Sequence, residues 1–220
     1  MSDTFDHMAD TVDKSYVKYL FDNPDYDQDR PLYIDPGNPQ RTLSANEIKS
    51  MISHIVAGLR HHGLKKSDPV CVMSLNDIYY TPLYLGIMAA GGIFTGMNPS
   101  YTPHEVSHHL SLCKVKFLIA SPAALETAKA AADKSGLAKD RVFVFNPLKH
   151  KDKHGLKSWW CLMYHGEAEW EPVFDPEMEA ACYISSSGTS GLPKAVVVPH
   201  KYLENQVKLL VERDLPYKVS

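Results

Sequence analysis

The chain has 220 residues, of which 44% are hydrophobic and 22% are charged, and its formal net charge is −3 at pH 7. This apolar content is enough for a buried core, which excludes an intrinsically disordered chain. The small negative charge gives no basic surface, so nucleic acid is not an expected partner. None of the four cysteines forms a C-x-x-C pair. We expect free thiols in a reducing compartment, which favours the cytoplasm.

From the sequence we expect no secretory signal at the start of the chain and no peroxisomal signal at its end. The first residues, MSDTFDHMAD, are acidic and lack the apolar run of a secretory signal. The last three, KVS, do not match a peroxisomal address, so a peroxisomal location would require a C-terminal signal on a longer form. Residues 78–101 contain no Asp, Glu, Lys or Arg, but proline and glycines interrupt them. Their apolar part is shorter than the ~20 residues that a membrane span needs, so no transmembrane segment is expected.

The first regular element in the sequence is a helix over residues 44–62. Apolar residues recur there at helical spacing, Ser44 and Glu47 form a capping box, and Gly63 follows the last turn. The run VCVM at 70–73 predicts a strand. An uncharged helix is expected over 78–90, and a further strand over 93–95.

The alternation of strands and helices continues toward the middle of the chain. Thr102, Pro103 and Glu105 are in register for an N-cap, a first-turn proline and a capping-box partner. A strand at 117–120, a helix from Ser121 to about Ser135 and a strand at 142–145 follow. The pattern predicts an α/β fold of alternating βαβ units, with a mostly parallel sheet covered by helices. The continuously apolar strands are typical of parallel strands buried on both faces.

Residues 146–178 are less regular and carry a basic run followed by an acidic one. We interpret this segment as a solvated excursion with local charge pairing, and the alternative is that one of the runs is a docking surface. Two further strands are expected at 181–184 and 195–198, with a helix from His200 or Lys201.

The last two predicted strands flank the sequence SSSGTSGLPK, residues 185–194. Glycine-rich turns let successive backbone N–H groups converge on an anion, and hydroxyl groups add donors. A lysine at the exit supplies a point charge for phosphate. The Walker A pattern does not match, because Lys194 follows Pro193 and no Ser or Thr follows it. The loop therefore predicts a phosphate site of another class.

The loop resembles the signature phosphate loop of adenylate-forming enzymes, the AMP-binding acyl- and aryl-CoA ligases that include 4-coumarate-CoA ligase and luciferase. The family pattern reads roughly [ST]-S-G-T-[TS]-G-x-P-K-G, and the chain departs from it only at Ala195, where glycine is usual. The stretch AGGIFTGMNPSYTPHEV, residues 90–106, resembles a second family segment. The resemblance covers about 15–220.

This resemblance implies part of the large N-terminal domain of adenylate-forming enzymes and a two-step reaction. A small carboxylic acid would be activated by ATP to an acyl-adenylate, and the thiol of CoA would then take the acyl group. Mg²⁺ would bridge the phosphates, and no protein residue is expected as a metal ligand. The residues that would hold the β- and γ-phosphates are Ser186, Ser187, Gly188, Thr189, Ser190, Gly191 and Lys194.

The resemblance also implies parts of the family's site that the sequence lacks. We find no adenine-side motif, no ribose-binding aspartate and no small C-terminal domain. We therefore expect 1–220 to be a truncated N-terminal AMP-binding domain whose catalytic residues would lie beyond the C-terminus, and which does not complete the reaction alone. The alternative is an inactive fragment that acts as an interaction partner, for example of a full-length ligase or of the missing C-terminal part, or that is a relic.

A rival interpretation comes from His104, Glu105 and His108, which match H-E-x-x-H on a predicted helix. In zinc peptidases the two histidines bind the metal and the glutamate activates water. Against this, Glu105 is already the predicted capping partner of Thr102, and Lys114 stands where the longer motif needs a third histidine. Glu126 is the only plausible distant carboxylate. We keep the zinc peptidase as a remote alternative.

Overall fold

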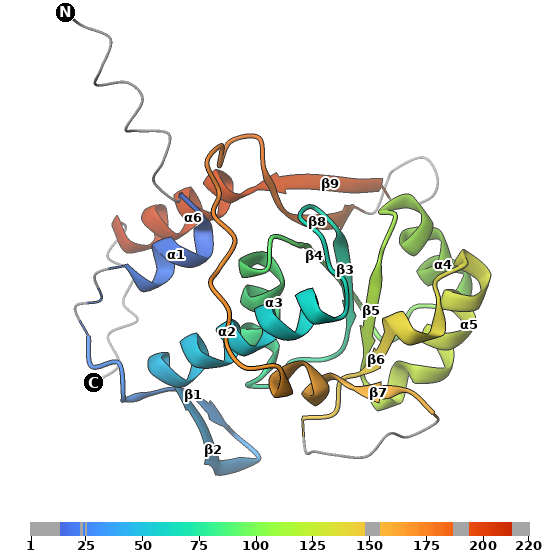
Figure 1. Cartoon of the computed structure of the whole chain (residues 1–220), viewed down its shortest axis with the longest axis horizontal. Helices are drawn as coiled ribbons and strands as arrows, with labels where there is room; N and C mark the ends of the chain where they lie inside the picture. Colours follow the sequence, from blue (N-terminus) through green and yellow to red (C-terminus); the bar gives the residue numbers. More distant parts are fainter. Residues whose placement is uncertain (1–13, 23, 25, 148–154, 187–193, 213–220) are drawn as a thin grey trace, which may run out of the picture.

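The computed structural model describes residues 14–22, 24, 26–147, 155–186 and 194–212, and Figure 1 shows them arranged around a seven-stranded sheet. The strand order is β7-β6-β5-β3-β4-β8-β9. All neighbouring strands are parallel except β8 and β9, which are antiparallel. The predicted α/β fold with a mostly parallel sheet is confirmed. The strands are β3 (Pro69–Met73), β4 (Ile93–Met97), β5 (Phe117–Ala120), β6 (Val142–Val144), β7 (Lys157–Ser158), β8 (Ala180–Ser186) and β9 (Lys194–Pro199).

Helices cover both faces of this sheet, as Figure 1 shows. One face packs against α2 (Ala45–His61), α3 (Tyr80–Ala89) and the 3-10 helix η4 (Trp159–Tyr164). The other packs against α4 (Pro103–Leu112) and α5 (Leu125–Ser135), with short 3-10 turns η2 (Pro122–Ala124) and η3 (Lys139–Arg141) beside them. In the described ranges, no helix combines the length and apolar character needed to cross a membrane.

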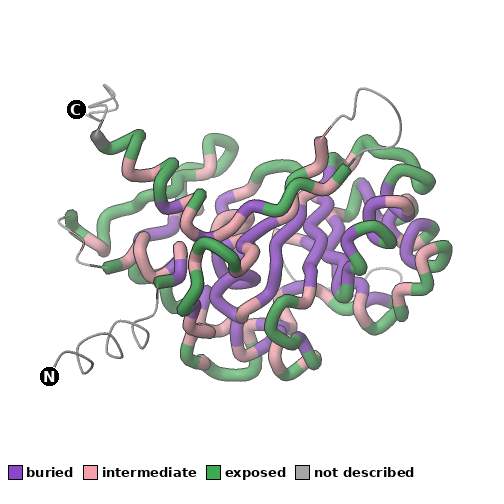
Figure 2. The backbone as a smooth tube through the Cα atoms, turned by 90° about the horizontal axis from the view of Figure 1, so that it is seen from above, coloured by how far each residue is buried: buried purple, intermediate pink, exposed green. Residues whose placement is uncertain are grey.

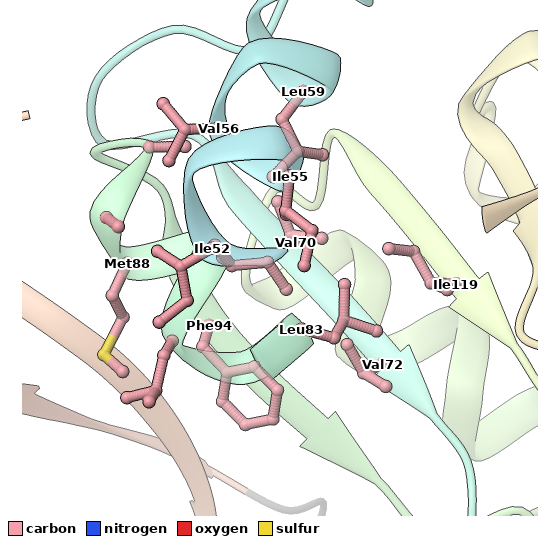
Figure 3. Close-up of a cluster of buried hydrophobic side chains, with 14 of the residues drawn as sticks. Ile52, Ile55, Val56, Leu59, Val70, Val72, Leu83, Met88, Phe94 and Ile119 are labelled. Atoms are coloured by element: carbon pink, nitrogen blue, oxygen red, sulfur yellow. The ribbon is translucent and has the colours of Figure 1, made fainter. Parts of the chain in front are cut away.

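The strands send alternate side chains into two separate cores. In β3, Val70 and Val72 join the core under α2 and α3, whereas Cys71 and Met73 join the core under α4 and α5. Every residue of β3 is buried, and Figure 2 shows a continuous buried run through the middle of the molecule. Because both faces are covered, these strands need no polar alternation. Figure 3 shows the first core, where Ile52, Ile55, Val56 and Leu59 of α2 lie with Val70, Val72, Leu83, Met88, Phe94 and Ile119.

Both predicted capping boxes are present. In α2, the Glu47 backbone N–H donates to Ser44 Oγ at 3.2 Å, and Ser44 N–H donates to Glu47 Oε2 at 2.7 Å. In α4, Thr102 N–H donates to Glu105 Oε2 at 2.8 Å, and Glu105 N–H donates to Thr102 Oγ1 at 3.3 Å. Gly63, after α2, has the positive φ of 85° that favours glycine at this place.

Several elements were not predicted from the sequence. They include α1 (Tyr16–Phe21), a separate hairpin of β1 (Pro31–Asp35) and β2 (Asn38–Ser44), and also β7 and η4 in the segment that was expected to be irregular. The C-terminal helix α6 (His200–Glu212) lies beside α1, where the Tyr16 backbone N–H donates to His200 Nδ1 at 3.2 Å.

The segment after β6 is mostly irregular, as expected, but its charge pairing is not local. Glu171 pairs with Arg60 of α2 at 2.9 Å, and Glu179 pairs with Lys66 at 2.8 Å. Much of the basic run, residues 148–154, lies outside the described residues. The acidic run therefore ties the segment to α2 and to the turn after it.

Candidate functional site

The carboxyl ends of the parallel strands, including β4 and β8, lie along one edge of the sheet. In open α/β sheets, ligands bind outside this edge. The β8–β9 hairpin extends from it, with Ser186 as the last residue of β8 and Lys194 as the first residue of β9. These two residues are directly paired in the antiparallel register. The fold therefore brings the two ends of the predicted phosphate loop together at the carboxyl edge of the sheet.

The other predicted loop residues, Ser187, Gly188, Thr189, Ser190 and Gly191, lie outside the described residues. Ser186 is half-buried and Lys194 is exposed.

The departure from the family pattern at Ala195 has a simple structural setting. Ala195 lies inside β9 and pairs with Ser185. Among the described non-glycine residues, only Ser67 and Lys114 have a positive φ. Ala195 therefore does not adopt the conformation that would call for glycine.

A cavity of about 370 Å³ lies beside the end of β8. It joins the two segments that the sequence singled out: Tyr101 and Glu105 come from the second segment, and Ser185 and Ser186 come from the start of the loop. The sequence predicted both segments but not that they share a cavity. The remaining lining residues are Met97, His108 and His109.

The buried histidine of this cavity, His109, was missed by sequence reasoning. Its Nε2 lies 2.8 Å from Thr95 Oγ1, and its Nδ1 lies 3.2 Å from Ser185 Oγ. Thr95 Oγ1 also donates to the Tyr183 carbonyl oxygen at 3.0 Å. Burial, and next the neighbouring His108, lower the pKa of His109 below its usual value, which favours the neutral ring. A single histidine on a helix gives no sequence signal for such a contact.

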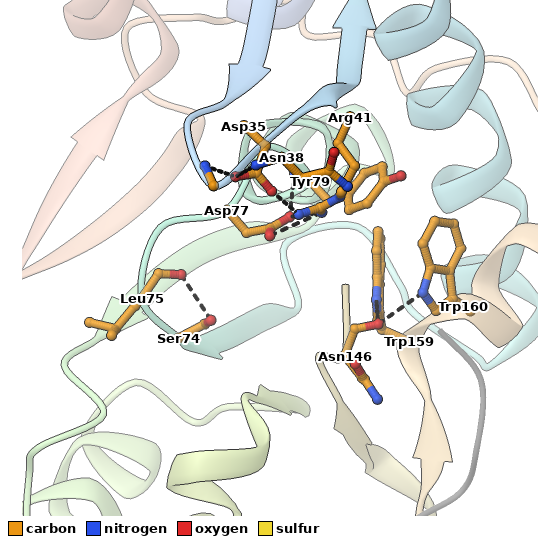
Figure 4. Close-up of polar contacts among 11 residues, drawn as sticks. Asp35, Asn38, Arg41, Ser74, Leu75, Asp77, Tyr79, Asn146, Trp159 and Trp160 are labelled. Carbon is orange, nitrogen blue, oxygen red and sulfur yellow. Dashed lines mark hydrogen bonds and ion pairs between the residues drawn. The ribbon is translucent and has the colours of Figure 1, made fainter. Parts of the chain in front are cut away.

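A second polar cluster at the same edge follows the end of β3, and Figure 4 shows it. Arg41 Nη2 lies 3.1 Å from both carboxylate oxygens of Asp77, and Arg41 also bonds to Asp35 and lies over the Tyr79 ring. The backbone N–H of Gly37, with the nearby Arg41 charge, keeps the pKa of Asp35 below its usual value. With both carboxylates paired to one guanidinium, this cluster fixes the β1–β2 hairpin to the β3–α3 connection.

The H-E-x-x-H segment is the start of α4. Glu105 is exposed, and its carboxylate accepts hydrogen bonds from the backbone and the side chain of Thr102. His104 is exposed and has Lys134 Nζ at 3.5 Å. Within the part of the chain that the structure describes, no group of three or more His, Cys, Asp or Glu side chains could hold a metal ion. The observed role of Glu105 is to cap the helix.

Comparison with known proteins gives consistent relatives. The chain is 39% identical over 210 residues to phenylacetyl-CoA ligase epaB of Aspergillus niger, a match that covers 93% of this chain and 39% of that protein. It is 38% identical over 210 residues to acyl-CoA ligase azaF, also of Aspergillus niger, with 93% and 40% covered. The chain thus spans about two fifths of the length of these curated relatives.

Solved structures share the fold at lower identity. The anthranilate CoA ligase AuaEII in complex with anthranoyl-AMP superposes with a TM-score of 0.75 at 18% identity, covering 86% of this chain and 35% of that one. A benzoate CoA ligase from Burkholderia xenovorans also gives 0.75, at 19% identity, covering 90% and 37%.

A family model described as AMP-binding enzyme matches residues 20–218. This range includes the sheet, both helical layers and the β8–β9 hairpin that holds Ser186 opposite Lys194. Together with the ligases above, it leads to one conclusion: this chain belongs to the AMP-binding enzyme family.

Proposed function

We propose that this chain supplies the phosphate-binding part of an ATP-dependent ligase that activates a small carboxylic acid and transfers it to CoA. The observation that carries the proposal is the pairing of Ser186 with Lys194 at the carboxyl edge of the sheet. The names of the relatives, a phenylacetyl-CoA ligase and an acyl-CoA ligase, support the substrate class.

The chemistry of these two side chains fits a polyphosphate. A serine hydroxyl can donate to a phosphate oxygen, and an ammonium group attracts the phosphate charge. Lys194 is exposed, so its charge is available to a ligand that reaches this edge. Mg²⁺ bound to the phosphates would neutralise further charge.

The role of these residues would be positioning and charge stabilisation. Fixed donors placed where negative charge develops stabilise a leaving pyrophosphate without reorganisation. Ser187, Gly188, Thr189, Ser190 and Gly191 complete the proposed phosphate-binding set, on the resemblance of the sequence. Neither Ser186 nor Lys194 needs to act as a nucleophile in this scheme.

Isothermal titration of the 220-residue chain with ATP and Mg²⁺ tests the proposal. We expect weak but saturable binding that is lost without Mg²⁺, because phosphate contacts alone give limited affinity. Complete absence of nucleotide binding would instead favour the second candidate, an inactive chain that serves as an interaction partner.

Carboxylate-dependent exchange between ATP and pyrophosphate separates binding from chemistry. We expect no exchange from this chain alone, since it spans about two fifths of its relatives. Clear exchange, dependent on an added carboxylic acid, would overturn that expectation and would place the adenylation chemistry within residues 1–220.

A further inference from the structure

We propose that His109 is a positioning residue that fixes the Ser185 hydroxyl group, and with it the end of β8, next to the candidate phosphate loop. The proposal rests on the proposed function, because β8 leads directly into that loop. His109 belongs to α4 and is separated from Ser185 by 76 positions in the sequence. Their contact therefore joins α4 to the end of β8, and both residues line the 370 Å³ cavity.

The hydrogen bonds that His109 makes with Thr95 and Ser185 can be assigned proton by proton; Cys113 Sγ lies farther away, 3.7 Å from Nε2 and 3.9 Å from Nδ1. The Tyr183 carbonyl can only accept, so the single hydroxyl proton of Thr95 is donated to it at 3.0 Å. Thr95 Oγ1 must then accept from His109, which places a proton on Nε2. In the neutral ring this leaves Nδ1 unprotonated, so Ser185 donates its hydroxyl proton to Nδ1 at 3.2 Å.

This proton assignment gives the two adjacent serines, Ser185 and Ser186, different roles. A hydroxyl has one proton, so Ser185 cannot donate to His109 and to a phosphate oxygen at the same time. Both serines line the 370 Å³ cavity, but the hydrogen bond to His109 is made by Ser185. In this proposal Ser185 holds the end of the strand, and Ser186, for whose hydroxyl group the described residues show no hydrogen-bond partner, is the serine that would donate to a phosphate oxygen.

Burial makes this arrangement sensitive to change. Thr95 is fully buried and His109 is 4% exposed. A buried polar group that loses its partner pays the full desolvation penalty, so an apolar residue at 109 would leave Thr95 with an unfilled acceptor and would release Ser185.

The pair does not have the composition of a nucleophile and its base. The far nitrogen of His109 bonds to a neutral hydroxyl group rather than to a carboxylate. The one carboxylate that lines the same cavity, that of Glu105, accepts hydrogen bonds from Thr102. The geometry thus favours orientation of Ser185 over its activation.

Nuclear magnetic resonance of the ¹⁵N-labelled chain tests the proton assignment directly. Long-range ¹H–¹⁵N correlations at neutral pH should show His109 with Nε2 protonated and Nδ1 unprotonated, and Ser185→Ala should shift the Nδ1 resonance. A protonated Nδ1, or no response of Nδ1 to Ser185→Ala, would overturn the proposal. This result does not depend on nucleotide binding.

Titration with MgATP tests the functional consequence. His109→Leu and Ser185→Ala should each weaken binding about threefold to tenfold, the effect of one lost hydrogen bond. Both substitutions remove the hydrogen bond between Ser185 and His109. The double variant should therefore bind MgATP no more weakly than whichever single variant has the lower affinity. His109→Gln, which keeps a donor and an acceptor, should stay within about twofold of the original chain.

Ser186→Ala and His54→Leu serve as matched controls. When Ser186→Ala is combined with His109→Leu, the fold losses of MgATP affinity should multiply. His54→Leu on α2 should leave the affinity unchanged. If instead the fold losses of affinity from Ser185→Ala and His109→Leu multiply in the double variant, Ser185 contacts the ligand independently of His109 and the proposal fails. A chain that binds no MgATP at all would contradict the proposed function, while the tautomer measurement would still decide the role of His109.

Discussion

The centre of the sheet and its β8–β9 end are covered very differently. All five residues of β3 are buried, between α2 and α3 on one face and α4 and α5 on the other. On β9, by contrast, Val196 and Val197 are 49% and 58% exposed, and Ile184 on β8 is 53% exposed. The apolar strand character is the same in both regions, but only the centre is packed on both sides within the described residues.

We expect the packed centre of the sheet to determine stability and the exposed β8–β9 hairpin to determine ligand binding. The centre holds most of the packed side chains, whereas the hairpin carries the paired residues Ser186 and Lys194 and is tied to α4 through Ser185 and His109. Regions with few buried contacts open at low free energy, as ligand-binding segments often do. We therefore expect substitutions in the centre to change folding and substitutions at the hairpin to change binding.

The largest expected effect on stability is that of Gly58→Ala, where α2 contacts η4. An ideal Cβ at Gly58 would lie 2.2 Å from the Leu162 carbonyl oxygen and 2.4 Å from its Cα, so backbone would have to move. We expect the free energy of unfolding to fall by about 3 kcal/mol, despite the better helix propensity of alanine. Urea unfolding measures this, with the exposed Lys49→Ala on the same helix as control. If the free energy of unfolding fell by less than about 1 kcal/mol, the backbone of η4 could move away from α2 at little cost.

A matched pair of valines compares the two regions directly. Val72→Ala, at a position 1% exposed, should reduce the free energy of unfolding by about 2 kcal/mol, because it leaves a cavity. Val197→Ala, 58% exposed, should change it by less than about 0.5 kcal/mol. Equal losses in the two variants, again by urea unfolding, would mean that β9 is covered in solution.

A smaller effect should appear as the pH falls. Burial, followed by the charge of Lys157, lowers the pKa of His62 to about 4, while the unfolded chain titrates near its usual value of about 6.5. Between these values the unfolded state binds more protons, so stability falls as pH decreases from about 6.5 toward 4.

The expected loss between pH 7 and 5 is about 1 kcal/mol, reduced from the full linkage value because His62 is partly exposed. His62→Gln should flatten the pH dependence of urea unfolding over this range. A variant that retains the original slope would assign the effect to other groups. This prediction concerns the packed centre, since the His62 ring lies against Phe143 of β6.

Local sequence signals predicted most of the sheet and the helices around it. The capping boxes of Ser44 and Thr102 set the starts of α2 and α4, and continuous apolar runs gave the buried strands. The β1–β2 hairpin was missed, although its turn contains Pro36 and Gly37, because β1 and the first half of β2 are mostly exposed and only the end of β2 is buried.

The site could be predicted only in part. The loop composition pointed to Ser186 and Lys194, and the structure pairs these two residues across the β8–β9 hairpin. The contact between His109 and Ser185 could not be predicted, because it joins α4 to β8 across 76 positions and no local pattern encodes such a distance. Long-range side-chain pairs follow from the packing of elements rather than from their individual sequences.

The proposed phosphate-binding role of Lys194 is tested by the affinity of Lys194→Met for MgATP, measured by isothermal titration beside Lys49→Met. Both lysines are exposed, but of the two only Lys194 stands opposite Ser186 at the carboxyl edge of the sheet. We expect at least a tenfold loss of affinity, about 1.4 kcal/mol, for Lys194→Met and none for Lys49→Met. Unchanged binding by Lys194→Met, or equal losses in both variants, would contradict the proposed role of Lys194.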